Sequence, residues 1–158
     1  MTVAGSVRPA VGSVAPDFTL SSSAREPVTL SSFRGRQHVL LAFFPMAFTS
    51  TCTEDLCEMG EDYEQYARHD VQVLGISCDL GPALAAFKAA RNIGVELLSD
   101  ARREVSRAYG VMREDDGFSE RAYVLIDREG ILRWMHVEAE LGHRRGTAEL
   151  IRQLEALG

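Results

Sequence analysis

The sequence contains little cysteine and no long apolar run. Its 158 residues include only three cysteines, too few for a disulfide scaffold in a chain of this length. No apolar run reaches the roughly 20 residues that a membrane-spanning helix needs, and residues 1–10 lack the apolar core of a signal peptide. We therefore expect a soluble, cytoplasmic protein without a membrane partner.

Basic residues are in the minority: 17 lysines and arginines stand against 23 acidic residues, for a net charge of −6. No basic patch is available to meet phosphates, which argues against a nucleic-acid partner. The sequence also lacks a Cys-x-x-Cys pair, a glycine-rich phosphate loop and a Gly-x-Ser-x-Gly elbow, and its four histidines are scattered singly. We therefore expect no metal and no cofactor.

The pattern of apolar residues predicts one domain over residues 11–158, preceded by a flexible arm over residues 1–10. Short apolar runs predict strands at residues 14–20, 28–30, 38–44, 71–76, 95–98, 122–126 and 131–137. Helical spacing predicts helices at residues 53–69, 81–92, 102–109 and 147–157, and residues 112–120 read as a polar loop. This order predicts an α/β, thioredoxin-like fold, in which helices flank a mixed central sheet and a β-hairpin precedes it.

Cys52 lies between the apolar run that ends in Pro45 and the helix expected from Thr53. At the start of a helix, backbone N–H groups and the positive end of the dipole favour a thiolate, which is the nucleophilic form of cysteine. The neighbouring carboxylates of Glu54 and Asp55 act against it, because like charge disfavours a thiolate. A reactive Cys52 therefore needs a cation from elsewhere in the chain.

Arg121 is the best candidate for that cation, because its side chain is always charged and a predicted strand holds the backbone next to it. Its alternative role is an ordinary ion pair with the acidic helix. Thr49, three residues before Cys52, either donates a hydrogen bond to the thiolate and orients a substrate oxygen, or simply caps the helix. Pro45 ends the strand, and it can also wall a pocket from water.

Cys57 follows Cys52 by five residues, and helix geometry separates the two. Five helical residues rise about 7.5 Å and rotate about 140°, which puts the two Cα atoms roughly 8–9 Å apart. A disulfide needs Cα atoms within about 7 Å, so Cys52 and Cys57 can join only if the first helical turn unwinds. Otherwise Cys57 packs as a small apolar residue. Cys78, at the end of the strand predicted at residues 71–76, is either a core residue or a reserve resolving partner for Cys52.

The spacing Pro45-x-x-x-Thr49-x-x-Cys52, after an apolar strand and before a helix, resembles the active-site signature of the peroxiredoxins. The likeness covers residues 11–158. It includes residues 15–20 (APDFTL), 40–52 (LLAFFPMAFTSTC), 98–100 (LSD), 108–111 (AYGV), and Arg121 before residues 122–127 (AYVLID).

This resemblance implies a thiol-dependent peroxidase that reduces hydrogen peroxide and organic hydroperoxides without a cofactor. Cys52 would be the peroxidatic cysteine, and Thr49, Pro45 and Arg121 would complete its pocket. Asp55 falls in a slot that often holds Glu or Gln, where it would anchor Arg121. The shorter Asp departs from that pattern, as does Thr53, where several relatives carry proline.

Two branches of the family compete. Residues 40–52 and 98–111 are similar to the one-cysteine, alkyl-hydroperoxide-reductase-E-like branch. The spacing of Cys52 and Cys57 is similar to the bacterioferritin-comigratory-protein branch, which implies that Cys57 is the resolving cysteine and that thioredoxin or a similar dithiol reduces the disulfide. The alternatives are recycling by an external thiol and a non-catalytic redox sensor. We expect a monomer or homodimer, in which Phe48 lines either a dimer contact or a substrate collar.

Overall fold

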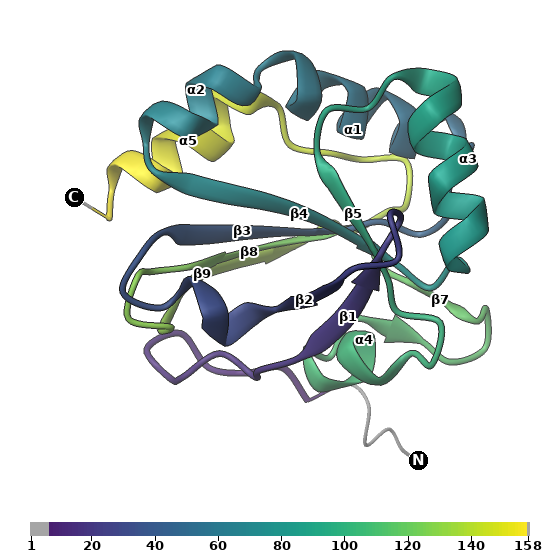
Figure 1. The fold of residues 1–158 in the computed structure, drawn as a ribbon. Coiled ribbons are helices and arrows are strands. Elements are labelled where there is room, and N and C mark those ends of the chain that lie inside the picture. The colour runs from purple at the N-terminus through teal and green to yellow at the C-terminus, as the bar shows by residue number, and fades with distance from the viewer. Residues whose placement is uncertain (1–6, 158) are drawn as a thin grey trace.

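The computed structural model describes residues 7–157, which build a seven-stranded mixed sheet (Figure 1). Its strands are β1 (Thr19–Ser22), β2 (Pro27–Thr29), β3 (His38–Phe43), β4 (Val71–Ser77), β5 (Glu96–Ser99), β8 (Ala122–Ile126) and β9 (Leu132–Val137). Their order is β2-β1-β5-β4-β3-β8-β9, with β3, β4 and β5 parallel and the remaining pairs antiparallel. The predicted mixed sheet and N-terminal hairpin are confirmed.

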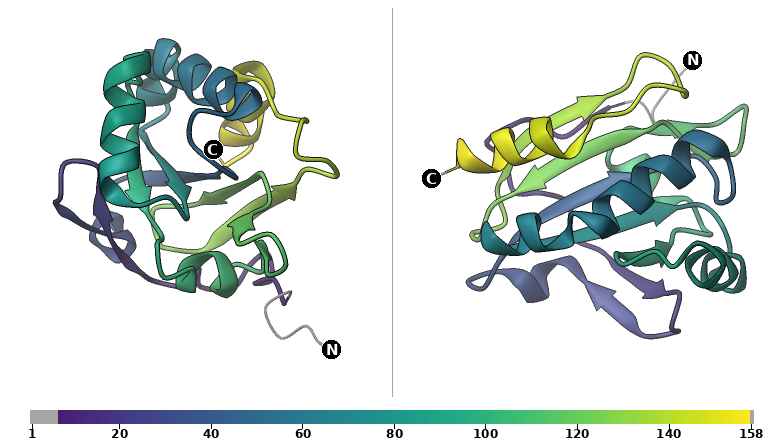
Figure 2. Two further views of the ribbon diagram at one scale, coloured as in Figure 1. Left: turned by 90° about the vertical axis from the view of Figure 1, so that its right-hand side faces the viewer. Right: turned by 90° about the horizontal axis from the view of Figure 1, so that it is seen from above.

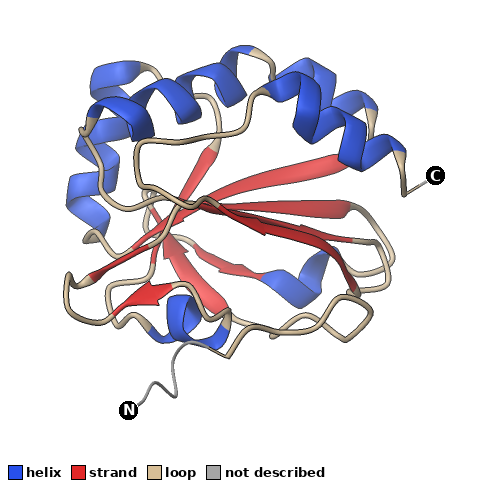
Figure 3. Ribbon diagram, turned by 180° about the vertical axis from the view of Figure 1, so that it is seen from behind, coloured by secondary structure: helices blue, strands red, loops and turns tan. Residues whose placement is uncertain are grey.

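Helices cover both faces of this sheet, as predicted (Figures 1 and 3). One face carries α1 (Ser50–Glu61), α2 (Tyr63–Arg68), α3 (Gly81–Arg91) and α5 (Thr147–Glu155). The other face carries α4 (Glu104–Ala108) and the 3-10 turn η2 (Leu30–Phe33). The view from above in Figure 2 shows α1, α2 and α5 lying over the sheet, and the short loop after the central strand β3 leads into the start of α1.

The central strand β3 is buried along its whole length, between parallel β4 and antiparallel β8. Its continuous apolar sequence fits burial on both faces, where alternating polar residues would be left without water. Pro45 lies two residues after the end of β3 and cannot continue the ladder because it has no N–H. The chain therefore turns at this point toward the start of α1.

The helix that the sequence predicts at residues 53–69 differs from the structure at its start and in its middle. It begins at Ser50, after Thr49 in an extended conformation, so Cys52 lies within the first turn rather than before it. It is interrupted at Asp62, between α1 and α2. The Asp62 carboxylate accepts a hydrogen bond from the Thr147 hydroxyl at 2.6 Å, a tertiary contact that helical periodicity cannot reveal.

The predicted polar loop at residues 112–120 is wrong, because this segment forms a small hairpin. Its strands are β6 (Met112–Arg113) and β7 (Phe118–Ser119), with Gly117 in the left-handed region at φ +81°. The Arg113 guanidinium lies 5.9 Å from the centre of the Phe118 ring. Two-residue strands in a charged stretch give no periodicity, so the sequence pattern indicated only a loop.

Residues 1–6 of the predicted arm lie outside the described residues. In the part that is described, the Arg8 guanidinium donates to the carbonyl of Gly110 at 3.1 Å. This contact lays the start of the described chain against the end of α4. Between residues 7 and 157, no helix is long and apolar enough to cross a membrane.

Candidate active site

Cys52 lies in the first turn of α1 and is only 1% exposed. It contributes to the wall of a cavity of about 310 Å³ that opens at this edge of the sheet. The cavity is lined by Pro45, Met46, Thr49, Ser50, Thr51, Cys52, Phe118, Arg121, Leu141 and Gly142. A small molecule that enters this cavity can therefore meet the sulfur.

Arg121 is the predicted cation, and the structure places it on the sulfur. Its Nη2 donates to Sγ of Cys52 at 3.0 Å, and both side chains are 1% exposed. Nε and Nη2 also donate to the carbonyl of Leu141, at 3.4 and 3.3 Å. A guanidinium held this close, and shielded from water, is positioned to stabilise negative charge that develops at the sulfur or on an oxygen bound beside it.

The backbone at Arg121 is held on both sides. Ala122 begins β8, whose five residues are all buried, and it pairs with Phe43 of β3 and Val137 of β9. The carbonyl of Arg121 accepts a hydrogen bond from the Glu138 amide at 2.9 Å. Because these bonds already fix the backbone of Arg121, placing the guanidinium at the sulfur costs mainly the conformational entropy of the side chain.

Asp55 lies behind Arg121, one turn after Cys52 on α1. Its Oδ2 is 3.5 Å from Nη1 of Arg121, and its Oδ1 is 3.8 Å from Nη1 of Arg144. Oδ2 also accepts a hydrogen bond from the Tyr123 hydroxyl at 2.8 Å. The predicted support of Arg121 by Asp55 is therefore present as a charge contact.

Burial raises the pKa of Asp55 from 3.8 to about 6, although the Tyr123 hydroxyl, Arg121 and Arg144 each act to lower it. Burial also raises the pKa of Tyr123, and the Asp55 carboxylate raises it further. The Tyr123 hydroxyl therefore keeps its proton at neutral pH and acts as a donor. Asp55 carries its charge at pH 7 and loses it as the pH falls through about 6.

Sequence reasoning missed Arg144 and Glu58, which extend this cluster. Arg144 donates to both carboxylate oxygens of Glu58, at 3.1 and 3.4 Å, and Glu58 accepts from the Thr147 amide at 3.0 Å. Burial acts to raise the pKa of Glu58, but these bonds outweigh it and lower that pKa. In the sequence, Glu58 is marked only by its position six residues after Cys52, and the many other acidic residues of this helix give it no distinction.

Thr49 and Pro45 line the same cavity as Cys52, as the sequence predicts, but Thr49 bonds differently. Its hydroxyl donates to the carbonyl of Met46 at 2.7 Å and makes no capping hydrogen bond. The expected donation to the sulfur is therefore replaced by a bond to the loop. Because this bond uses the only hydrogen of the hydroxyl, the threonine oxygen can act toward a bound molecule only as a hydrogen-bond acceptor.

Phe48 does not line this cavity. It is 51% exposed, adopts φ +69°, and packs its ring 5.0 Å from the ring of Phe87 on α3. Its position on the outer side of the loop does not fit the predicted substrate collar.

Cys57 is separated from the Cys52 cavity by the helix. All three cysteines are free, and Sγ of Cys57 lies 3.9 Å from the carbonyl of Arg91, at the end of α3. Cys78 lies on the opposite face, with Sγ 3.7 Å from the Ser106 hydroxyl, and burial raises the pKa of its thiol. The structure therefore brings neither thiol into contact with Arg121.

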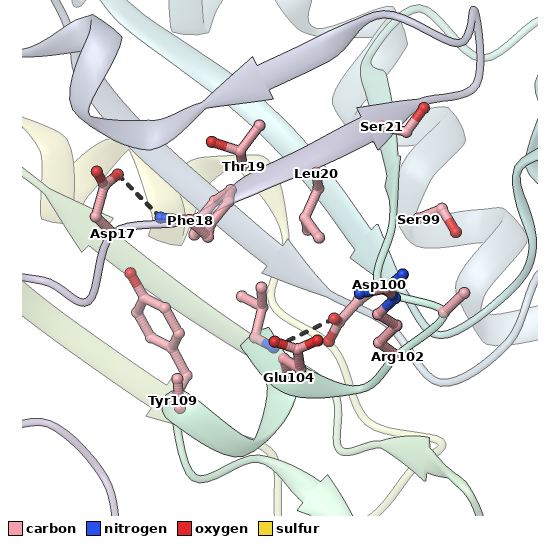
Figure 4. A pocket seen from close by; sticks show the side chains of 13 residues that line it. Asp17, Phe18, Thr19, Leu20, Ser21, Ser99, Asp100, Arg102, Glu104 and Tyr109 are labelled. Carbon is pink, nitrogen blue, oxygen red and sulfur yellow. Dashed lines mark hydrogen bonds between the residues drawn. The ribbon is translucent and has the colours of Figure 1, made fainter.

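A larger cavity of about 620 Å³ lies between β1 and α4 and contains none of the cysteines (Figure 4). Two carboxylates of its lining accept hydrogen bonds from the backbone: the exposed Asp17 from the Phe18 amide at 2.9 Å, and the buried Asp100 from the Val105 amide at 3.2 Å. The smaller cavity is therefore the candidate active site, because Cys52 and Arg121 meet in its lining.

Comparisons with known proteins agree with this geometry. Residues 11–135 match the AhpC/TSA family. The chain is 36% identical over 130 residues to alkyl hydroperoxide reductase E of Mycobacterium tuberculosis, covering 81% of this chain and 85% of that protein. It is also 36% identical over 154 residues to peroxiredoxin 2 of Thermoplasma acidophilum, covering 93% and 75% of the two chains.

Solved structures show the same fold. The reduced 2-Cys peroxiredoxin of Plasmodium vivax superposes with a TM-score of 0.87 at 32% sequence identity, covering 94% of this chain and 82% of that one. The AhpC structure of Enterococcus faecalis also gives a TM-score of 0.87, at 24% identity. Because the family match spans most of the sequence and the relatives align along most of both chains, this chain belongs to the AhpC/TSA family and is a peroxiredoxin.

Proposed function

We propose that this peroxiredoxin reduces hydrogen peroxide and small organic hydroperoxides with Cys52 and passes the oxidation to Cys57. The observation that carries the proposal is the 3.0 Å contact between Nη2 of Arg121 and Sγ of Cys52 at the wall of an open cavity. A buried thiolate that borders such a cavity and is held by a guanidinium is arranged for nucleophilic attack.

In the first step, the Cys52 thiolate attacks the terminal oxygen of the hydroperoxide. A sulfur–oxygen bond forms as the oxygen–oxygen bond breaks, which oxidises the sulfur and reduces the peroxide. The leaving alkoxide or hydroxide takes a proton and departs as an alcohol or water, and Cys52 is left as a sulfenic acid. Arg121 stabilises the charge that moves along the breaking bond, a placement effect in a site shielded from water.

Thr49 orients the peroxide in this proposal. Its hydroxyl donates to the carbonyl of Met46, so its oxygen is free to accept a hydrogen bond from the O–H group of the bound hydroperoxide. Pro45 forms part of the cavity wall without offering an N–H that would hold water. The two residues thus select an approach in which the terminal oxygen meets the sulfur.

The second step joins Cys57 to Cys52 with loss of water from the sulfenic acid. The first turn of α1 must unwind, because an intact helix keeps the two Cα atoms apart. A first turn is the part of a helix that opens most easily, since its N–H groups lack partners within the helix. A dithiol protein such as thioredoxin then reduces the disulfide by exchange, in a cytoplasmic location that keeps thiols reduced.

One observation favours recycling by an external thiol instead. Cys57 is half-buried, and its sulfur faces the Arg91 carbonyl on the far side of α1 from Arg121. If the first turn stays folded, a small thiol that enters the cavity is the only route to the Cys52 sulfenic acid. The two mechanisms differ in the product that remains after one oxidation.

Mass spectrometry after one equivalent of hydrogen peroxide tests the proposal. We expect a Cys52–Cys57 disulfide in the wild type, and a Cys52 sulfenic acid trapped by dimedone in Cys57→Ser. Cys78→Ser is the matched control and should give the wild-type product. A stable Cys52 sulfenic acid in the wild type would contradict Cys57 as the resolving residue and support the external thiol.

Peroxide consumption by Cys52→Ser tests the first step. The variant should consume no peroxide in the presence of thioredoxin and its reductase, because a serine hydroxyl is not ionised at neutral pH and has no sulfur to oxidise. Consumption at the wild-type rate would remove the enzymatic role of Cys52. Oxidation of wild-type Cys52 without repeated turnover, whatever thiol is supplied, would instead indicate a redox sensor.

A further inference from the structure

Tyr123 lies two residues after Arg121, so both side chains project to the α1 face of the sheet. It is fully buried, and its hydroxyl donates to Oδ2 of Asp55 at 2.8 Å. The same hydroxyl accepts the backbone N–H of Arg145 at 3.0 Å. Neither bond involves Cys52, and the peroxidase chemistry described above makes no use of this tyrosine.

The direct contact between Asp55 and Arg121 is long for an ion pair. Oδ2 of Asp55 and Nη1 of Arg121 are 3.5 Å apart, and among the described residues Nη1 has no hydrogen-bond partner. Asp55 lies on α1 and has a side chain one methylene shorter than that of Glu, which limits its reach toward Nη1. The hydroxyl of Tyr123 fixes the oxygen that faces the guanidinium.

Tyr123 also holds the segment that binds the other side of Arg121. The amide that it accepts belongs to Arg145, in the connection between β9 and α5. The Leu141 carbonyl, which accepts from Nε and Nη2 of Arg121, lies in the same connection. One hydroxyl therefore ties together both supports of the guanidinium.

We propose that Tyr123 is a positioning residue for the peroxidase reaction, which compensates for the short side chain of Asp55 and thereby holds Arg121 against the Cys52 sulfur. The inference rests on the proposed role of Cys52. It predicts that loss of one hydroxyl, buried and outside the cavity lining, slows the first oxidation. It also predicts that a longer acid at position 55 makes the hydroxyl dispensable.

The charges around Asp55 set how this role depends on pH. Arg121 precedes β8, Arg144 lies in the connection before α5, and Glu58 shares α1 with Asp55. Asp55 must be ionised to attract Arg121, and its pKa of about 6 is held down in part by the Tyr123 hydrogen bond. Loss of that bond raises the pKa of Asp55, so the decline in rate toward acid should begin at a higher pH.

Stopped-flow oxidation of Tyr123→Phe by hydrogen peroxide tests this inference. We expect the second-order rate constant at pH 7 to fall about tenfold, as for loss of one hydrogen bond to a charged group. Tyr109→Phe is the matched control: its buried hydroxyl donates to the Pro16 carbonyl at 2.7 Å, on the opposite face of the sheet. Tyr123→Phe that matches Tyr109→Phe at every pH would overturn the proposal.

Rescue separates positioning from a structural role. Asp55→Glu combined with Tyr123→Phe should recover most of the lost rate, because one added methylene closes the gap to Nη1 of Arg121. A double variant no faster than Tyr123→Phe would overturn the compensation. If circular dichroism shows Tyr123→Phe unfolded, the double variant is compared with Asp55→Glu alone, and equal rates are expected.

Alkylation of Cys52 by iodoacetamide, followed by peptide mass spectrometry, gives a readout without peroxide. Tyr123→Phe should slow the alkylation of Cys52 at pH 7, whereas Tyr109→Phe should not; an unchanged alkylation rate in Tyr123→Phe would overturn the proposal. If the wild type consumes no peroxide but Tyr123→Phe is still alkylated more slowly than the wild type, the proposed function is contradicted and the positioning of Arg121 by Tyr123 stands.

Discussion

Asp55 and Arg121 face each other across 3.5 Å with both side chains almost fully buried, yet no hydrogen bond joins them. Their attraction acts over a short distance and away from water, where it is strong. The direction of the guanidinium is set instead by its bonds to Cys52 and to the Leu141 carbonyl. Charge keeps Arg121 in this region, and hydrogen bonds aim it.

Arg121→Ala should slow the first oxidation of Cys52 by on the order of a hundredfold, as for loss of one preorganised donor at a reacting centre. Arg121→Lys should recover only part of this rate, because a single ammonium cannot reach Cys52, Leu141 and Asp55 together. Stopped-flow fluorescence measures both rates. Arg107→Ala, which removes an exposed arginine paired with Glu114, is the control; equal rates in Arg107→Ala and Arg121→Ala would make Arg121 structural.

Thr49→Val keeps the shape of the side chain but removes the oxygen that we propose to orient the peroxide. The rate constant for peroxide should fall about tenfold, in keeping with one lost hydrogen bond. The rate of Cys52 alkylation by iodoacetamide should stay unchanged, because alkylation needs no peroxide proton acceptor. Thr19→Val, at an exposed threonine of β1 whose hydroxyl bonds to that of Thr29, serves as the control. A parallel loss of both rates in Thr49→Val would show that Thr49 acts on the sulfur itself.

Asp55→Asn should change how stability depends on pH. The pKa of Asp55 is raised from 3.8 to about 6 in the folded protein, so the folded state holds a proton that the unfolded chain releases between these values. The free energy of unfolding due to Asp55 therefore falls as pH rises through this window. As the pH rises from 4 to 7, the free energy of unfolding of Asp55→Asn should therefore increase relative to that of the wild type, by on the order of 3 kcal/mol.

Urea unfolding of both proteins at several pH values measures this difference. The comparison with Asp55→Asn cancels the contributions of Glu58, Asp127 and Glu138, whose pKa values are lowered and which act in the opposite direction. A difference that is constant from pH 4 to pH 7 would mean that Asp55 titrates alike in the folded and unfolded states.

Gly60→Ala should destabilise the fold despite the preference of alanine for helices. A Cβ at Gly60 would lie 2.7 Å from the backbone nitrogen of Gly94, which cannot yield as a flexible side chain does. We expect a loss of about 1–3 kcal/mol in the free energy of unfolding, typical of overpacking. Gly81→Ala, where a Cβ meets nothing within 4 Å, should change stability little. Two equal urea midpoints would show that α1 can move away from Gly94.

Most strands and helices could be predicted because their signals are local. The alternation in β8 sends Tyr123 and Leu125 to one core and Val124 to the other, and the buried β3 reads as an unbroken apolar run. Asn92 ends α3 in the left-handed conformation within the expected boundary. The hairpin β6–β7 could not be predicted, because its two-residue strands are stabilised mainly by their place in the fold.

The site residues were predictable to different degrees. Cys52, Thr49 and Pro45 are close in the sequence, so their spacing alone places them together. Arg121 could be proposed because a thiolate among acids needs a cation, although 69 residues separate the two. Tyr123 gave a signal that went unused, since its position two residues after Arg121 puts both side chains on one face.

The position of the proposed nucleophile, the helix that carries it and the strands that hold that helix can be inferred from local patterns, because apolar periodicity and backbone capping act over a few residues. Packing between distant segments sets which groups meet around the sulfur. The Leu141 carbonyl on Arg121, the Tyr123 hydroxyl on Asp55 and the distance of Cys57 from the cavity all follow from packing between distant segments. Such contacts depend on distances of a few ångströms, which no local pattern of residues specifies.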